Sequence, residues 1–134
     1  MGIQAAGTFE IESWEEEPYD ENDGAKLTRT RLTKTFRGDV EGESTAELLM
    51  AYAAKEGSAA YVGFERVVGC VHGRSGSFVI HHTASSGGPD GEPSASWTVV
   101  PDSGTGELRG LRGEARISNE PDGGHSFTLD YDLE

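Results

Sequence analysis

The last segment of the chain alternates between apolar and polar side chains, and this alternation limits the fold more than any other feature. From Phe127 to Leu133 every second residue is apolar, and the residues between them are polar. On an extended strand the apolar side chains share one face, whereas on a helix they would be spread around the circumference. The sequence therefore predicts a half-buried β-strand at this end of the chain.

Turn signals recur along the rest of the chain and divide it into similar short segments. The 19 glycines among the 134 residues follow no triplet period and cluster with Asp, Asn, Pro and Ser, as in tight turns. Segments around Phe9 and Trp97 alternate in the same way as the last one. About eight strands with short turns and no interruption predict one all-β domain over residues 1–134, built as a sandwich or a barrel.

One segment conflicts with this pattern. Residues 44–57 begin with a capping box (Ser-Thr-Ala-Glu), continue with strong helix formers and stop at Gly57. Local propensity therefore favours a helix. The alternative is a strand with every second residue from Ala46 to Tyr52 on one face, and composition leaves both structures open.

The chain is strongly acidic, with 24 Asp and Glu against 11 Lys and Arg and a formal net charge of −13. This excess repels phosphate backbones and anionic lipid, so no nucleic acid and no membrane surface is expected as a partner. The charge is also patterned, because residues 10–23 hold eight of the acids and residues 26–37 hold five of the bases. Adjacent antiparallel strands with complementary outward charges explain this pattern better than a basic ligand-binding stripe.

The cysteine content and the N-terminal residues favour a cytoplasmic protein. Cys70 is the single cysteine, which excludes an internal disulfide, and its neighbours Val68 and Val71 favour a small core residue over a nucleophile. The first residues have no basic start followed by an apolar run of signal-peptide length. No run of apolar residues is long enough to span a bilayer.

Two motif-like patterns are not expected to carry chemistry. Gly104-Thr105-Gly106 suggests a phosphate loop, but a dinucleotide site needs a helix directly afterwards, and residues 108–113 are poor helix formers. His81 and His82 are adjacent, so on a strand they point to opposite faces and cannot bind one metal ion together. We therefore expect no metal and no cofactor.

Residues 99–113 carry a more informative pattern, which is a strand, then Gly-Thr-Gly, then a bulky residue and a further glycine. This pattern resembles the allene oxide cyclase and dirigent barrel superfamily. The closer similarity is to an uncharacterised bacterial branch of it, a domain of unknown function of similar length. That similarity covers nearly the whole chain and includes the stretches Thr8–Ile11, Ser13–Glu16, Gly63–Val67, Gly73–Val79 and Thr128–Asp132.

The resemblance implies a closed eight-stranded antiparallel barrel with a partly apolar cavity. It also implies that Thr45 to Tyr52 is a barrel strand rather than a helix. Homo-oligomers are frequent in the superfamily, so a dimer or trimer is expected. The resemblance supplies no catalytic residues, and His81 departs from the branch, which usually has Gln at that position.

The hairpin around His72–Gly76 suggests candidate site residues. If those five residues form the loop, Arg66 lies opposite His82, and both share a face with apolar residues. A cation and an imidazole would then face the barrel interior, where buried polar groups need partners. In this register Glu65 points outward. If His82 lies on the outer wall instead, Glu65 and Thr83 are the next candidates for the polar residues of the lumen.

The expected function is binding of a small, largely apolar molecule in the lumen. Related barrels act mainly by holding a reactive substrate in one conformation, so a cofactor-free cyclisation or isomerisation is the expected chemistry. The candidate catalytic residues are Arg66, His82 and Glu65, and the candidate ligand-binding residues are Tyr52, Trp97 and Tyr131. The alternative is a non-catalytic binding or homo-oligomeric assembly protein with a side-chain-filled barrel.

The same hairpin suggests where subunits meet. In the register above, Val67 and Val71 lie on the face opposite Phe64, so this strand is apolar on both sides. Strands covered on both sides have this composition. We therefore expect a second subunit to cover the outer face that carries Val67 and Val71.

Overall fold

The structure is a computed structural model that describes residues 2–87, 94–119 and 124–133. The strands follow one another along the chain as β1 (Ile3–Asn22), β2 (Ala25–Gly38), β3 (Val40–Tyr52), β4 (Ala59–Val71), β5 (Arg74–Ser86), β6 (Ser94–Val99), β7 (Arg112–Asn119) and β8 (His125–Asp132). A 3₁₀ turn, η1 (Gly106–Leu108), lies between β6 and β7. Within the described ranges, no helix has the length and apolar character that a bilayer crossing requires.

The strands form a closed barrel. Each strand pairs antiparallel with its neighbour in sequence, and β8 pairs with β1. This confirms the predicted all-β class and the closed eight-stranded antiparallel barrel.

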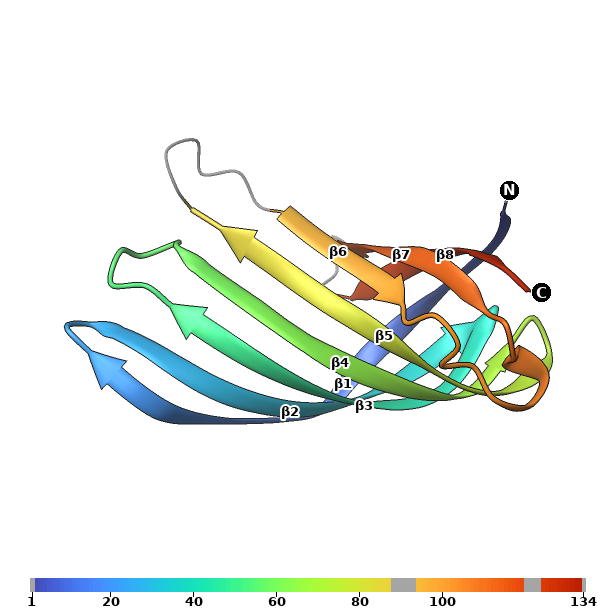
Figure 1. Cartoon of the computed structure of the whole chain (residues 1–134), viewed down its shortest axis with the longest axis horizontal. Helices are drawn as coiled ribbons and strands as arrows, with labels where there is room; N and C mark the ends of the chain where they lie inside the picture. The colour runs from blue at the N-terminus through green and yellow to red at the C-terminus, as the bar shows by residue number, and fades with distance from the viewer. Residues whose placement is uncertain (1, 88–93, 120–123, 134) are drawn as a thin grey trace.

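The barrel is closed over only part of its length. β1 pairs with β8 from Ile3 to Phe9, and its later residues pair with β2 alone. β6 and β7 meet at the pairs Trp97–Ala115 and Thr98–Glu114. The long strands β1–β5 therefore extend beyond β6–β8 as a curved sheet, to the left of the closed part in Figure 1. We call this the open end, because the wall made by the described strands is incomplete there.

Apolar side chains fill the closed end. Phe9, Phe36, Phe78 and Phe127 belong to one buried cluster there, and Leu108 and Leu111 join it with no exposed surface. A smaller cluster of Leu32, Ala46 and Leu48 lies nearer the open end, with Met50 and Tyr61 packed against it. The closed end is therefore a filled core rather than a cavity.

The segment with helical propensity is a strand, as the resemblance implied. β3 runs to Tyr52, and residues 53–58 connect it to β4. Leu48 pairs with Thr30 on one side and with Gly63 on the other. A helix could not form these two ladders, so pairing with both neighbours outweighs the weak local preference.

The acidic and basic segments pair as predicted. Glu15 lies opposite Arg31 and Glu17 opposite Arg29 in the β1–β2 ladder. At an exposed surface, each pair of opposite charges on neighbouring strands adds roughly a few tenths of a kcal/mol to the stability of the sheet. The charge pattern therefore serves strand pairing on the outer wall.

The hairpin between β4 and β5 is tighter than predicted. His72 and Gly73 have φ angles of 48° and 79°, and the strand resumes at Arg74, so the turn holds two residues instead of five. Positive φ at both central positions is characteristic of a type I′ turn, whose twist matches that of the flanking strands.

The shorter turn changes which residues face the lumen. Gly63, and not Arg66, lies opposite His82. Because side chains alternate along a strand, Gly63 and Arg66 lie on opposite faces of β4. The prediction that Arg66 faces the interior is therefore wrong. Val67 and Val71, predicted on the outer face, are buried inside at 1% and 0% exposure.

Candidate functional site

A group of polar side chains lies inside the barrel, and we call it the polar column. It consists of Lys34 on β2, Ser44 on β3, Glu65 on β4 and His82 on β5. None of the four is more than 5% exposed. Each lies two residues from apolar core residues on its strand, and because every second side chain points to the same side, it faces inward as they do.

Glu65 is the centre of the polar column. Its Oε1 atom lies 2.6 Å from Nε2 of His82 and 3.3 Å from Nζ of Lys34. Its Oε2 atom accepts a short hydrogen bond from the Ser44 hydroxyl. A buried carboxylate without partners would be strongly destabilising, so these three donors are what keep the charge inside the barrel.

Lys34 neutralises the carboxylate and is held by two aromatic rings. Its Nζ atom lies 4.6 Å from the centroid of the Phe9 ring and 4.3 Å from that of the Trp97 ring, within the range of cation–π attraction. Burial lowers the pKa of Lys34, while the charge and the hydrogen bond of Glu65 oppose that effect. The carboxylate and the ammonium together bring no net charge into the barrel.

The ionisation of Glu65 and His82 follows from these contacts. Burial raises the pKa of Glu65, but the His82 hydrogen bond, the Lys34 charge and the Ser44 hydroxyl together hold it below its ordinary value. Burial lowers the pKa of His82, and the Glu65 hydrogen bond offsets this only in part. At neutral pH the imidazole is therefore neutral. An ionised carboxylate only accepts hydrogen bonds, so Nε2 carries the proton and Nδ1 the lone pair.

The lone pair on Nδ1 of His82 is the unused polar group of the column. Among the described residues, no hydrogen bond reaches Nδ1. Every fully buried side-chain nitrogen or oxygen among them has a hydrogen-bond partner. Nδ1 has no partner, so it is not fully buried. The Trp97 ring lies against the imidazole, with centroids 3.9 Å apart and an interplanar angle of 62°, and restricts its orientation.

A small pocket lies one row of side chains beyond His82 and Trp97, toward the open end. Tyr61, Ala84 and Ala95 are paired across β4, β5 and β6 and form this row, and His82 and Trp97 belong to the next row inward. The pocket has a volume of about 240 Å³, and its lining includes the whole row. The small alanine side chains leave this space open, one row of side chains from the imidazole.

Tyr61 connects the pocket with the polar column. Burial raises the pKa of its phenol, a hydrogen bond with Trp97 lowers it, and the charge of Glu65 raises it further. The net effect is a raised pKa, so the hydroxyl stays protonated at neutral pH. It can therefore donate a hydrogen bond to a molecule in the pocket.

Tyr52 also lines this pocket and belongs to a separate polar group. Its hydroxyl donates to Oε2 of Glu16 at 2.7 Å, and Thr28 donates to the same oxygen at 2.7 Å. Trp14 donates to the other carboxylate oxygen at 3.2 Å. Burial and the neighbouring Glu16 carboxylate raise the pKa of Tyr52 to about 12. These bonds join β1, β2 and β3 and leave no free group comparable to Nδ1 of His82.

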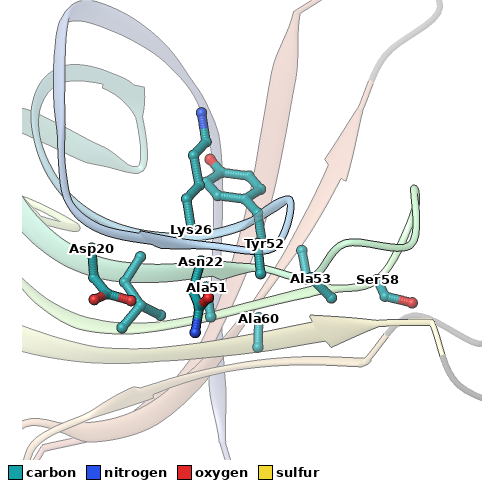
Figure 2. Close-up of a pocket in the computed structure, with 11 residues that line it drawn as sticks. Asp20, Asn22, Lys26, Ala51, Tyr52, Ala53, Ser58 and Ala60 are labelled. Atoms are coloured by element: carbon teal, nitrogen blue, oxygen red, sulfur yellow. The ribbon is translucent and has the colours of Figure 1, made fainter.

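A second pocket, of about 500 Å³, lies at the tips of the β1–β2 and β3–β4 hairpins. Figure 2 shows Asp20 and Asn22 near the small side chains Ala51 and Ala60, while Lys26 and Tyr52 project together in another direction. None of the titratable residues in this lining is buried. The smaller pocket, one row of side chains from the buried His82, is therefore the candidate functional site.

Residues 5–131 match a family described as a protein of unknown function, DUF3224. The chain belongs to the DUF3224 family. A crystal structure of a DUF3224 protein of unknown function from Shewanella oneidensis MR-1 is similar to it, with 37% sequence identity and a TM-score of 0.84. The similarity covers 100% of this chain and 99% of that one. No curated protein matches the sequence.

Membership of DUF3224 confirms the predicted relation to a domain of unknown function. The wider relation to allene oxide cyclases and dirigent proteins stays a prediction. Neither the description of DUF3224 nor that of the Shewanella oneidensis protein states an activity, so a function for this chain has to be argued from its own residues.

The predicted catalytic residues of this DUF3224 protein separate into two places. His82 faces the lumen as predicted, whereas Glu65, predicted to point outward, is fully buried beside it. Arg66 lies on the outer wall, where its Nη1 atom is 3.4 Å from the Ser77 hydroxyl. The predicted Arg66–His82 pair is therefore replaced by a Glu65–His82 pair.

The predicted ligand-binding residues are also separated. Trp97 lies against His82, and Tyr52 lines the pocket. Tyr131 is buried in the cluster at the closed end, and its hydroxyl lies 2.5 Å from Nδ1 of His72. Tyr131 is not part of the pocket lining.

Sequence reasoning did not find Lys34, Ser44 or Tyr61. The signal for Lys34 was present, because it lies between Leu32 and Phe36 on the same face of the strand. Ser44 and Tyr61 carry no comparable signal, since serine and tyrosine occur on either face of a strand. In the part of the chain that the structure describes, no three His, Cys, Asp or Glu side chains are placed to hold a metal ion.

Proposed function

We propose that this protein binds a small, largely apolar molecule at the open end of its barrel and exchanges a proton with it through the Glu65–His82 pair. The observation that carries the proposal is the free Nδ1 atom of His82, one row of side chains from an apolar pocket. Ligand sites typically combine an apolar lining with a few convergent polar groups, and Tyr61 supplies a second such group here.

The Glu65–His82 pair has the parts of a general base. Glu65 accepts the Nε2 proton, which fixes the tautomer and orients the ring, so that Nδ1 is the basic atom. Glu65 also stabilises the imidazolium that forms when Nδ1 takes a proton. Lys34 limits this stabilisation, because its ammonium repels an imidazolium. The imidazole therefore accepts a proton transiently and releases it again.

This chemistry fits a cofactor-free isomerisation or cyclisation. Nδ1 removes a proton from an O–H group or an acidic C–H group, and the electron pair of that bond shifts within the bound molecule. The imidazolium then returns the same proton to another atom, so nothing is oxidised and no group leaves. The pocket walls hold the molecule in one conformation, which lowers the entropic part of the barrier. The resemblance to allene oxide cyclases supports this reaction class.

The test uses 2-naphthol, a neutral apolar molecule whose hydroxyl becomes strongly acidic when excited by light. In the wild-type protein we expect bound naphthol to transfer its proton to His82 and to emit as naphtholate. Ala84→Leu fills the pocket and should abolish binding, whereas Thr98→Leu, on the outer face of β6, should preserve it. His82→Gln should preserve binding and remove the naphtholate emission. Binding that survives Ala84→Leu would show that the pocket is not the site.

A non-catalytic barrel is the second candidate, and the filled closed end favours it. In that case the polar column has only a structural role, in which Glu65 joins β4 to β2, β3 and β5. The same experiment separates the two candidates. Folded wild-type protein that leaves the emission of 2-naphthol unchanged would favour the structural role.

A further inference from the structure

The outer face of β4 carries a row of exposed apolar side chains. Val62, Phe64 and Val68 are 42%, 56% and 57% exposed, and Arg66 lies between Phe64 and Val68 on the same face. Leu49, 47% exposed, pairs with Val62 from the neighbouring strand β3. We call these five residues the β4 stripe. Such a group is unusual on a chain in which 26% of the residues are charged.

The outer face of β5, next to the β4 stripe, also has few charged residues. The outward residues opposite it are Ser77, Val79, His81 and Thr83. The His81 ring stacks on Phe64, with centroids 5.2 Å apart and an interplanar angle of 23°. Centres of protein interfaces have this composition, with few acids and lysines and with aromatic residues and Arg enriched.

We propose that the β4 stripe binds a second copy of this chain in an antiparallel arrangement. On β4, Val62 and Val68 are each three residues from Glu65, and Phe64 and Arg66 are each one residue from it. A twofold axis that crosses β4 at the level of Glu65 places Val62 opposite Val68 of the partner subunit. The same axis places Phe64 opposite Arg66 of the partner subunit, and the contact occurs twice.

Charge complementarity favours this particular partner. Glu47 pairs directly with Phe64 across the β3–β4 ladder, on the outer face. A guanidinium from the partner's Arg66 that lies over the Phe64 ring is therefore also beside the Glu47 carboxylate. Cation–π attraction and an ion pair act on the same cation, and both are strengthened when water is excluded.

The size of the surface and the net charge agree with this partner. Three 13-residue strands, at about 3.4 Å per residue and about 4.8 Å between strands, have an outer face of roughly 600 Å², the same order as the roughly 800 Å² per partner of a standard interface. A net charge of −13 opposes contact between two copies in general. The one charged residue of the β4 stripe is the Arg66 cation, and it faces Glu47 across the twofold axis, while Glu43, the other outward acid beside the stripe on β3, lies opposite Val68 at its end. The proposal does not depend on the proposed function.

The test measures the mass of the intact protein in solution by sedimentation equilibrium at tens of micromolar. Wild-type protein should be a dimer. Phe64→Ser removes the central ring and Arg66→Glu places an acid beside Glu47, so both variants should be monomers. Tyr19→Ser is the matched control, because Tyr19 is an equally exposed aromatic residue (57%) on β1, outside the stripe. It should remain dimeric.

A charge exchange makes the test specific for the predicted contact. Adding Glu47→Arg to Arg66→Glu restores opposite charges across the twofold axis and should recover part of the dimer. Circular dichroism reports whether each variant is folded, and we expect an unchanged spectrum because the substituted side chains lie outside the barrel core. A monomeric or trimeric wild type, or a dimer that survives both Phe64→Ser and Arg66→Glu, would overturn the proposal.

Discussion

Oε1 of Glu65 lies 2.6 Å from Nε2 of His82, and this contact joins two parts of the barrel with different fillings. Toward the closed end, Glu65 is bound by Lys34 and Ser44, next to a core of apolar side chains. Toward the open end, His82 contacts Trp97, and a pocket of about 240 Å³ lies one row of side chains further on. The pair therefore links the buried charges of Lys34 and Glu65 to the side of the barrel on which this pocket lies.

Glu65→Gln should destabilise the protein strongly. The amide has nearly the same shape, but it removes the negative charge that neutralises the buried Lys34 ammonium. Loss of one partner from a buried ion pair costs about 3–5 kcal/mol, because the other charge is left without compensation. Urea denaturation followed by tryptophan fluorescence measures this as a fall in the free energy of unfolding.

Glu41→Gln is the matched control for that experiment. Glu41 is also a carboxylate in the β3–β4 ladder, but it is exposed on the outer wall and lies outside the β4 stripe. Its replacement should change the free energy of unfolding by less than about 0.5 kcal/mol. Equal effects of the two substitutions would contradict the central role of Glu65.

The stability should fall as the pH drops below the ordinary pKa of histidine. Burial lowers the pKa of His82, so the unfolded chain binds a proton that the folded protein rejects, and stability is complete only above that range. The lowered pKa of Glu65 acts in the same direction at lower pH, because protonation then removes its stabilising contacts. Lys34, Glu65 and His81 are the charged or titratable groups that influence His82. Denaturation curves from pH 8 to about pH 3 should show the His82 step and the beginning of the Glu65 step.

Two histidine variants separate the steps. In His82→Gln, the free energy of unfolding should no longer change between about pH 7 and pH 5, but it should still fall at lower pH. His81→Gln changes the adjacent residue, which lies on the outer face, and should retain both. If His81→Gln removed the upper step instead, the assignment to His82 would be wrong.

The fold could be predicted because its main signals are local. Alternation from Phe127 to Leu133 and the frequent turns are properties of short segments, and a strand pattern does not depend on distant residues. The β3 segment was harder, since its helix formers contradict its structure. Only its pairing on both sides, which no local window contains, decides that Ala46 and Leu48 lie on a strand.

The site was predicted only in part, because its residues depend on register. His82 was placed correctly, since its face follows from its own apolar neighbours. Glu65 faces inward and Arg66 outward, the reverse of the prediction, because the turn between β4 and β5 holds two residues and not five. A change of register by an odd number turns every side chain of a strand to the other face. Sequence signals for a type I′ turn usually contain Asn or Asp before Gly, and here the residue is His72.

The turn itself offers a further prediction. Gly73 has a φ angle of 79°, a region that β-branched residues adopt at a cost of about 1–2 kcal/mol. Gly73→Val should therefore lower the free energy of unfolding by that amount. Arg74→Val, one residue later on an exposed strand position, should have little effect. Equal stability of the two variants, measured by urea denaturation, would favour the longer loop and the other register.

The Glu16–Tyr52 hydrogen bond predicts an unusual titration at the rim of the pocket. Tyr52 should ionise only near pH 12, because burial and the Glu16 carboxylate both disfavour a phenolate. Glu16→Gln removes the negative charge and should bring the pKa of Tyr52 down toward its ordinary value. Glu17→Gln, which changes the next residue along β1, should leave the titration unchanged. Tyr52 can be followed separately from the other three tyrosines by comparing tyrosinate absorbance with that of Tyr52→Phe. A titration of Tyr52 that does not respond to Glu16→Gln would mean that the carboxylate is not its partner. The rim of the pocket would then lack the contact between β1 and β3 that fixes its shape.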